Sequence, residues 1–327
     1  MEKIRIGIVG GAGYTGGELI RLLLLHPYVD IACVLSKSHT HQPLYTVHTD
    51  LIGDTDLKFT DTLLEDIEVL FLCVAHGEAE KFLQQNEISE AVKIIDLSQD
   101  FRLQNTLSTN TRKFVYGLPE LQRESIIKAS NIANPGCFAT CLQLALLPLA
   151  SAQLLQHEVH VQATTGATGA GQGMSPTSHF AWRNNNLSAY KAFEHQHLHE
   201  INQSIQQLQP SFNHRINFIP QRGNFTRGIF ASTYVNSNLS LKDAYALFES
   251  YYATHPFVVI SKENIDLKQV VNTNKCVIYL ESHDDKLWIV SMIDNLLKGA
   301  SGQAVQNMNL LLHWPETTGL KLKASAF

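Results

Sequence analysis

The sequence predicts an α/β protein of two domains, the first on a doubly wound parallel sheet and the second on a mixed or antiparallel sheet. Length is the first observation, because 327 residues exceed the roughly 250–300 at which one hydrophobic core stops growing. The second is the alternation of apolar runs with helical patterns in the first third, and the third is a series of β-rich segments farther on. Hydrophobic residues make up 44% and charged residues 17%, which favours a globular over a disordered chain.

The first third has the pattern of βαβ units on a parallel sheet. The expected strands are Ile4–Val9, Ile31–Leu35, Val69–Ala75 and Val92–Leu97. The expected crossover helices are Thr15–Leu25 and Glu78–Gln85.

The second domain is expected to begin with a buried helix over Cys137–Ala150, which is rich in Leu and Ala and follows a Pro-Gly pair. The β-rich segments after it are Glu158–Thr165, Ile216–Pro220, Ile229–Val235, Cys276–Glu281 and Leu287–Ile293. Amphipathic helices are expected at His197–Leu208 and Leu241–Tyr252, on one face of the sheet. A last helix over Gly302–His313 follows the final strand and is expected to return to the first domain.

Composition excludes several classes of function. The formal charge of −5, without a concentrated Lys/Arg tract, argues against nucleic acid as a partner. The longest aliphatic run, Leu22–Leu25, is far shorter than the ~20 residues of a membrane span. The N-terminus leads directly into the first strand without a cleavage-site pattern, and five scattered cysteines suit a reducing compartment. We therefore expect a cytoplasmic protein.

A glycine-rich turn over Gly10–Gly16 follows the first strand and opens the first helix, which is the context of a dinucleotide-binding turn in a Rossmann domain. Glycines let backbone N–H groups approach a pyrophosphate at a helix N-terminus. The candidate cofactor-binding residues here are Gly10, Gly13, Tyr14, Thr15 and Gly16.

The end of the second strand indicates which dinucleotide binds. NAD-preferring domains usually carry an acidic residue there for the ribose 2′-hydroxyl. This chain has Ser36, Lys37 and Ser38 instead. Hydroxyl groups and a lysine can hold a 2′-phosphate, so we predict NADP as the cofactor, bound in part by Ser36 and Lys37.

Cys137 is the candidate nucleophile. It lies directly after Asn-Pro-Gly at an expected helix N-terminus, where the helix dipole favours a thiolate. Cys33, Cys73 and Cys276 lie in or at apolar strands and are interpreted as core residues. Cys141, one turn farther along the helix, either packs beneath the site or acts as a resolving thiol.

Four segments resemble the N-acetyl-γ-glutamyl-phosphate reductase family of arginine biosynthesis: Asp96–Leu103, Tyr116–Leu121, Asn134–Thr140 and Asp294–Asn309. The resemblance implies an oxidoreductase related to aspartate-semialdehyde dehydrogenase. It further implies an NADP-binding Rossmann domain over 1–136, completed by 296–327, and a catalytic and dimerisation domain over 137–295. By the same resemblance Asn295 lies near the nicotinamide, and the enzyme forms homodimers or homotetramers.

The histidine-rich segment Glu194–Glu200 resembles the family segment that supplies the catalytic imidazole, with His195 and His197 on family histidines. A thiolate needs an acid–base partner that titrates near neutrality. The choice between the two stays open, with a preference for His197. A zinc site that also includes His199 and the two helix cysteines is the rival, but alternate spacing suits neither a helical pair nor a zinc finger, so we predict no metal.

The chain departs from the family pattern where substrate would bind. Gln172 and Gln196 replace two arginines, and Phe138-Ala139 replaces Tyr-Pro after the nucleophile. Arg binds carboxylate or phosphate in a bidentate way that Gln cannot reproduce. Arg183 is the first candidate to compensate, followed by Arg222 and Arg227.

The resemblance thus implies NADPH-dependent reduction of an N-acyl-γ-glutamyl phosphate, with N-acetyl as the first candidate, through a thioester on Cys137. Alternatives are a reductase of another acyl phosphate, with an N-succinyl-glutamyl, aminoadipyl or aspartyl group, and a non-catalytic NADP-binding redox sensor.

Overall fold

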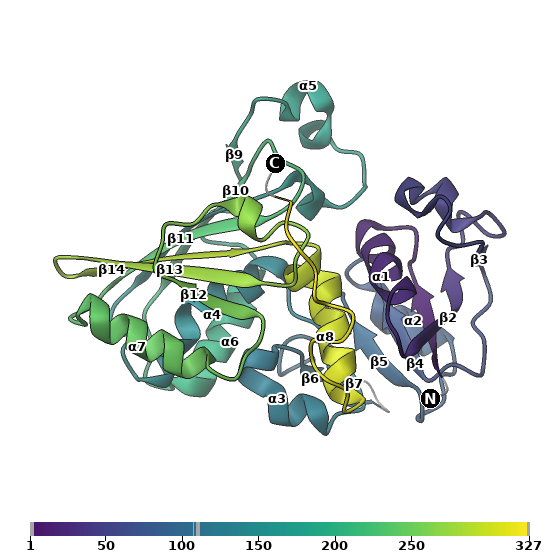
Figure 1. The fold of residues 1–327 in the computed structure, drawn as a ribbon, viewed down its shortest axis with the longest axis horizontal. Helices are drawn as coiled ribbons and strands as arrows, with labels where there is room; N and C mark the ends of the chain where they lie inside the picture. Colours follow the sequence, from purple (N-terminus) through teal and green to yellow (C-terminus); the bar gives the residue numbers. More distant parts are fainter. Residues whose placement is uncertain (1–2, 107, 109–111, 326–327) are drawn as a thin grey trace. The chain divides into compact units, whose positions relative to one another are not determined.

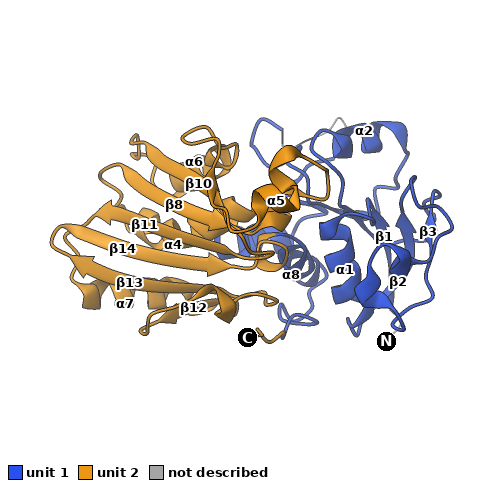
Figure 2. Cartoon of the chain, turned by 90° about the horizontal axis from the view of Figure 1, so that it is seen from above, with its two compact units in different colours: residues 1–135, 300–321 blue, residues 136–299, 322–327 orange. Residues whose placement is uncertain are grey.

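The computed structural model describes residues 3–106, 108 and 112–325. The chain divides into two compact units, coloured separately in Figure 2. Unit 1 comprises residues 1–135 and 300–321, and unit 2 comprises residues 136–299 and 322–327. The outer ends of the domains expected from the sequence, residues 1–2 and 326–327, lie outside the described residues.

Unit 1 is built on the parallel sheet that the sequence predicts. In the described part of this unit, seven strands follow the order β3-β2-β1-β4-β5-β7-β6, and all of their pairings are parallel. They are β1 (Ile4–Val9), β2 (Val29–Leu35), β3 (Phe59–Thr60), β4 (Val69–Leu72), β5 (Lys93–Asp96), β6 (Val115–Tyr116) and β7 (Asn131–Ala133). The chain winds outward from β1 to β3 and then returns to place β4 on the other side of β1, which makes the sheet doubly wound.

Four helices of the described residues accompany this sheet: α1 (Tyr14–Leu24), α2 (Glu78–Gln85), α3 (Pro119–Ile127) and α8 (Gly302–Leu311). The last of them, α8, packs against α1 and α3 (Figure 1). Its Asn307 Nδ2 donates to the Gly117 carbonyl at 2.8 Å and to Asn134 Oδ1 at 3.0 Å. The helix that follows the final strand therefore lies in unit 1.

Unit 2 carries the mixed sheet, which confirms the predicted fold class. Its described strands follow the order β12-β13-β14-β11-β8-β10-β9, with β8–β10 and β12–β13 parallel and the other pairs antiparallel. They are β8 (Val159–Thr165), β9 (Ser188–Ala189), β10 (Ile216–Arg222), β11 (Ile229–Asn236), β12 (Val258–Ser261), β13 (Cys276–His283) and β14 (Lys286–Ile293). Helix α4 (Cys137–Ser151) packs against β11, β13 and β14, and helices α6 (His197–Leu208) and α7 (Leu241–Tyr252) pack against α4.

Several short elements do not follow from the sequence pattern. Strands β3, β6 and β9 have two residues each, too few for an alternating pattern to be recognised. Helix α3 begins with Pro119 and carries a non-helical Gln122, so its apolar spacing is irregular. A π-helix over Leu297–Ser301 precedes α8, and such turns are frequent near functional sites.

The apolar helix α4 has 15 residues, fewer than the ~20 needed to span a bilayer. Within the described residues, no helix is long and apolar enough to cross a membrane.

Candidate active site

Cys137 is the first residue of α4, as predicted. Gly136 is the N-cap residue, and the Gly136 carbonyl accepts the first helical hydrogen bond from Thr140 N at 2.8 Å. Residues 138–150 of the helix are all buried, whereas Cys137 is half-exposed. The thiol therefore stands at the positive end of a rigid, buried helix, where a thiolate is stabilised.

His197 lies directly against the residue before the nucleophile. A Cβ added to Gly136 would be 2.3 Å from His197 Nε2, so only glycine allows this approach. Glu200, one turn along α6, accepts a hydrogen bond from Gly136 N at 3.0 Å and lies 4.0 Å from His197 Nε2. His197 and Glu200 are 7% and 3% exposed. The start of α6 therefore holds both the imidazole and the backbone that carries Cys137.

His195 lies next to His197 but has a different environment. The His195 Nδ1 accepts a hydrogen bond from His197 N at 3.2 Å, and the two rings meet edge to face at 4.6 Å. Burial, with help from the charges of Lys191 and Arg222, lowers the pKa of His195 to about 4. His195 is therefore uncharged at neutral pH, which argues against His195 as the group that gives up a proton.

The other cysteines have the environment of structural residues. Burial raises the pKa of Cys141 to about 12, and its sulfur contacts the Ser291 hydroxyl at 3.3 Å. Cys33, Cys73 and Cys276 are buried as well. Among the residues that the structure describes, no group of three or more His, Cys, Asp and Glu side chains is placed to hold a metal ion.

Asn295 joins two loops of unit 2. The Asn295 amide oxygen accepts from Gly228 N at 2.7 Å, and its nitrogen donates to Thr168 Oγ1 at 3.0 Å. The neighbouring Asp294 forms a 3.1 Å ion pair with Arg227. Arg227, one of the arginines considered for substrate binding, is thus engaged with a buried carboxylate.

The remaining candidates for substrate contact, Gln196, Gln172 and Arg183, differ in exposure and in hydrogen-bond partners. Gln196 lies beside the histidines, and its Oε1 accepts a hydrogen bond from Lys191 Nζ at 3.3 Å. Gln172 is exposed in the loop after β8. Arg183 is buried, and its guanidinium donates to the carbonyls of Arg222, at 2.8 Å, and Thr177, at 3.1 Å. These bonds engage the Arg183 guanidinium with backbone carbonyls of its own segment and of the end of β10.

Sequence reasoning missed Tyr190 and Lys191 and ranked Arg222 behind Arg183. The guanidinium carbon of Arg222 lies 4.6 Å from the centre of the Tyr190 ring, which in turn meets the His195 ring at 5.8 Å. The signal was available, since Arg222 closely follows the apolar run Ile216–Pro220 and side chains at the ends of buried strands often serve binding sites.

The glycine turn of unit 1 has the geometry that a pyrophosphate requires. Gly10 has a φ of +78°, and a Cβ there would lie 2.4 Å from the Cys73 carbonyl oxygen. A Cβ on Gly16 would lie 2.7 Å from the Gly10 carbonyl oxygen. Gly13 caps α1 without a side-chain hydrogen bond, and the first turn of α1 has no acidic residue. The helix N-terminus is therefore suited to a phosphate group.

The predicted 2′-phosphate residues adjoin this turn. Gly10 N and Gly11 N both donate to the carbonyl of Leu35, at 3.1 Å, and Ser36 follows Leu35 at once. Lys37 is exposed, and Ser38 Oγ is 2.8 Å from His39 Nδ1. The structure thus brings the turn and the Ser36–Ser38 segment to the same edge of the sheet, and the residues present fit NADP.

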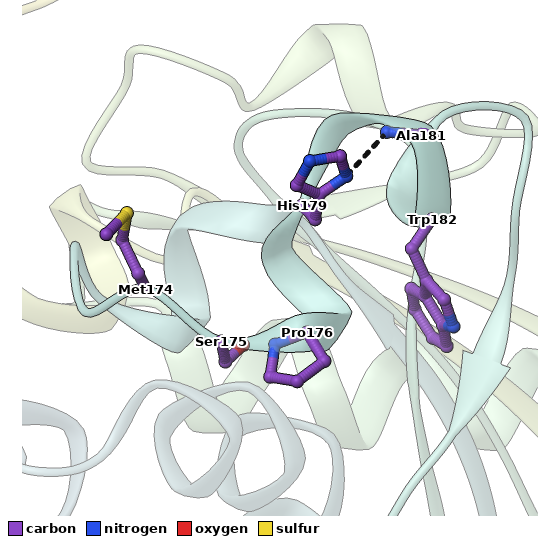
Figure 3. A pocket seen from close by; sticks show the side chains of 6 residues that line it. All are labelled: Met174, Ser175, Pro176, His179, Ala181 and Trp182. Atoms are coloured by element: carbon purple, nitrogen blue, oxygen red, sulfur yellow. Dashed lines mark hydrogen bonds between the residues drawn. The ribbon is translucent and has the colours of Figure 1, made fainter.

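A pocket of about 690 Å³ is formed by the segment that connects β8 and β9 (Figure 3). Its lining residues are Met174, Ser175, Pro176, His179, Ala181 and Trp182. The His179 ring accepts a 3.3 Å hydrogen bond from Ala181 N, drawn as a dashed line in Figure 3. This lining includes none of the predicted catalytic side chains, so we place the candidate site at Cys137 and the histidines.

Two family models match the chain, one on each side of Cys137. Residues 5–129 match "Semialdehyde dehydrogenase, NAD binding domain", and residues 137–295 match "Semialdehyde dehydrogenase, dimerisation domain". The fold agrees with solved structures of aspartate-semialdehyde dehydrogenases. The enzyme from Vibrio cholerae has a TM-score of 0.72 at 16% identity, covering 96% of this chain and 99% of that chain. The enzyme from Candida albicans, solved with NADP, has a TM-score of 0.68 at 12% identity, covering 95% and 99%. The fold and site therefore define a protein of the semialdehyde dehydrogenase class.

Curated relatives narrow the class. Proteins named N-acetyl-gamma-glutamyl-phosphate reductase from Parabacteroides distasonis and Bacteroides fragilis are each 57% identical over 325 residues, covering 99% of this chain and all of the relative. The one from Christiangramia forsetii is 54% identical over 324 residues, with the same coverage. The chain belongs to the N-acetyl-gamma-glutamyl-phosphate reductase family, which confirms the resemblance found in the sequence.

Proposed function

We propose that this chain reduces an N-acyl-γ-glutamyl phosphate, with N-acetyl as the first candidate, to the semialdehyde and phosphate, using NADPH, in arginine biosynthesis. The names of its relatives support this activity. The observation that carries it is the placement of Cys137 at the start of α4 with His197 against the preceding Gly136.

The proposed reaction begins with attack of the Cys137 thiolate on the acyl carbon. Phosphate leaves with the electron pair of the C–O bond and takes up a proton from solvent, and a thioester on Cys137 remains. NADPH, when bound, would supply the hydride that reduces this thioester. His197 gives a proton to the carbonyl oxygen and takes it back as the thiohemiacetal collapses, which releases the semialdehyde and restores Cys137.

The candidate cofactor residues of each unit are assigned separately. In unit 1, the turn formed by Gly10, Gly13, Tyr14, Thr15 and Gly16 would hold the pyrophosphate. The N–H groups of Tyr14, Thr15 and Gly16 open α1, and Gly10 and Gly13 shape the turn. Ser36 and Lys37 would hold the 2′-phosphate by hydroxyl and charge. In unit 2, the role of Asn295 near the nicotinamide rests on the family resemblance and stays a prediction.

Lys37→Ala tests the cofactor preference. We expect the KM for NADPH to rise by about 10-fold, because one charge-assisted contact to phosphate contributes ~1.5 kcal/mol or more, while the KM for NADH changes little. Initial rates with both cofactors measure this, with Lys58→Ala, another lysine of unit 1, as the control. Equal catalytic efficiency of the wild type with NADH would contradict NADP as the preferred cofactor.

The activity itself is best assayed in reverse, as reduction of NADP in the presence of phosphate and a semialdehyde. A panel of the semialdehydes of N-acetylglutamate, N-succinylglutamate, aminoadipate and aspartate compares the candidate substrates. We expect the N-acylglutamate compounds to be preferred. Absence of turnover with the whole panel would favour the redox-sensor alternative.

We further propose that the protein is a homodimer of cytoplasmic location. The match of residues 137–295 to a dimerisation domain supports self-association. Tyr234 is 42% exposed and stacks on His160 at 4.7 Å, so the sheet of unit 2 presents an aromatic surface on strands β8 and β11. Sedimentation should give at least twice the mass of one chain, and a monomer at micromolar concentration would rule the dimer out.

A further inference from the structure

Two cations stand near His195 without a carboxylate partner. Among the residues that the structure describes, neither Arg222 nor Lys191 has an Asp or Glu oxygen within 4.0 Å. The Nε of Arg222 is buried and has no hydrogen-bond partner in the described chain. A buried donor left without an acceptor costs about 1–3 kcal/mol, which an anionic ligand at Arg222 would recover.

Arg222 is held in a defined position. It ends β10, pairs with Thr165 of β8 and Ser188 of β9, and its carbonyl accepts from Arg183 Nη1 at 2.8 Å. The guanidinium packs on the Tyr190 ring at 4.6 Å. Arg183 therefore fixes the backbone of Arg222, and contact with the Tyr190 ring restricts the movement of the Arg222 guanidinium.

Tyr190 contacts both Arg222 and His195. Burial, opposed by Arg222 and reinforced by a charge on Cys137, raises the pKa of the Tyr190 phenol to about 12. Both charges act on this one side chain, so both are within electrostatic reach of it. The Tyr190 ring also meets the ring of His195, which adjoins His197.

We propose that Arg222, assisted by Lys191, binds a carboxylate of the substrate and so determines which acyl phosphates this enzyme accepts. The inference rests on the proposed function. The phosphate of the substrate is attached to the carbon that Cys137 attacks, whereas the α-carboxylate of a glutamyl group is separated from that carbon by three others. A cation held on the Tyr190 ring, which meets His195, suits the remote carboxylate better than the phosphate. Bidentate pairing with a carboxylate also satisfies the buried Nε.

Two carboxylates could bind Arg222: the α-carboxylate, and the carboxylate that an N-succinyl cap adds. Three aldehydes distinguish between these two possibilities. These are N-acetylglutamate semialdehyde, its analogue 4-acetamidobutanal, which lacks the α-carboxylate, and N-succinylglutamate semialdehyde. Each is assayed with phosphate and NADP for the wild type, Arg222→Leu, Arg222→Lys and Lys191→Ala. Arg215→Leu, an exposed arginine of the same unit, is the matched control, and thermal unfolding confirms that each variant folds.

We expect Arg222→Leu to raise the KM for a carboxylate-bearing aldehyde by about 10- to 100-fold with little change in kcat, and to leave 4-acetamidobutanal unaffected. Arg222→Lys should recover part of the loss. If the KM rises for both N-acylglutamate compounds, Arg222 binds the α-carboxylate. If the KM rises only for the N-succinyl compound, Arg222 binds the carboxylate of the cap.

The proposal fails if Arg222→Leu changes the KM for all three aldehydes equally, or if it changes only the KM for phosphate. A variant that folds and loses kcat alone also overturns it, because Arg222 would then act on the histidines. An inactive wild type would instead remove the proposed function itself.

Discussion

Cys137→Ser should reduce turnover below detection while NADPH still binds. A serine hydroxyl at the start of α4 does not form the anion that a thiol forms there, so the acyl group cannot be transferred to the enzyme. Steady-state assay of NADP reduction measures the loss, and quenching of protein fluorescence by NADPH measures cofactor binding. Residual activity within tenfold of the wild type would show that Cys137 is not the nucleophile.

Cys141→Ser is the matched control, because Cys141 lies one turn farther along α4 with its sulfur at Ser291. This variant should keep its turnover and lose only stability. Iodoacetamide should label Cys137 first, since Cys137 is half-exposed and the other four cysteines are buried. A peptide map with Cys141 or Cys276 modified faster would contradict the assignment.

Much of the fold could be predicted because the spacing of apolar residues and the length of each apolar run match the helix or strand that the segment forms in most places. Ile4–Val9 and Glu78–Gln85 have the predicted bounds. Strand β4 ends at Leu72, three residues before the predicted end at Ala75, because apolar character continues past the last paired residue. The order of strands in the mixed sheet depends on long-range pairings such as β8 with β11, which no local pattern reports.

The candidate site could be predicted only in part. Cys137 and His197 follow from local signals, a helix start and a histidine cluster, combined with the family resemblance. The closeness of His197 to Gly136 and the environment of Tyr190 arise from packing between segments distant in sequence. Arg183 illustrates the limit, because its position in the chain suggested a substrate contact and its hydrogen bonds to carbonyls appear only in three dimensions.

His197→Asn is expected to lower kcat by about 10²- to 10⁴-fold, the usual contribution of a positioned acid–base group. Asparagine keeps a polar side chain against Gly136 but cannot exchange a proton with the carbonyl oxygen of the substrate. His195→Asn should cost about tenfold or less, because His195 is uncharged at neutral pH and the change removes its hydrogen bond to His197 N and its ring contacts but no proton-transfer group. The measurements are kcat and the burst of thioester formation in a single turnover.

His199→Asn is the control for this pair, since His199 is exposed on the same helix, and its kcat should equal that of the wild type. A larger loss in His195→Asn than in His197→Asn would exchange the two roles, and the depressed pKa of His195 would then have to rise when substrate binds between Lys191 and Arg222. If all three variants kept the wild-type kcat, the cluster would have no part in proton transfer, and Glu200, which contacts Gly136 N at 3.0 Å, would be the next group to replace.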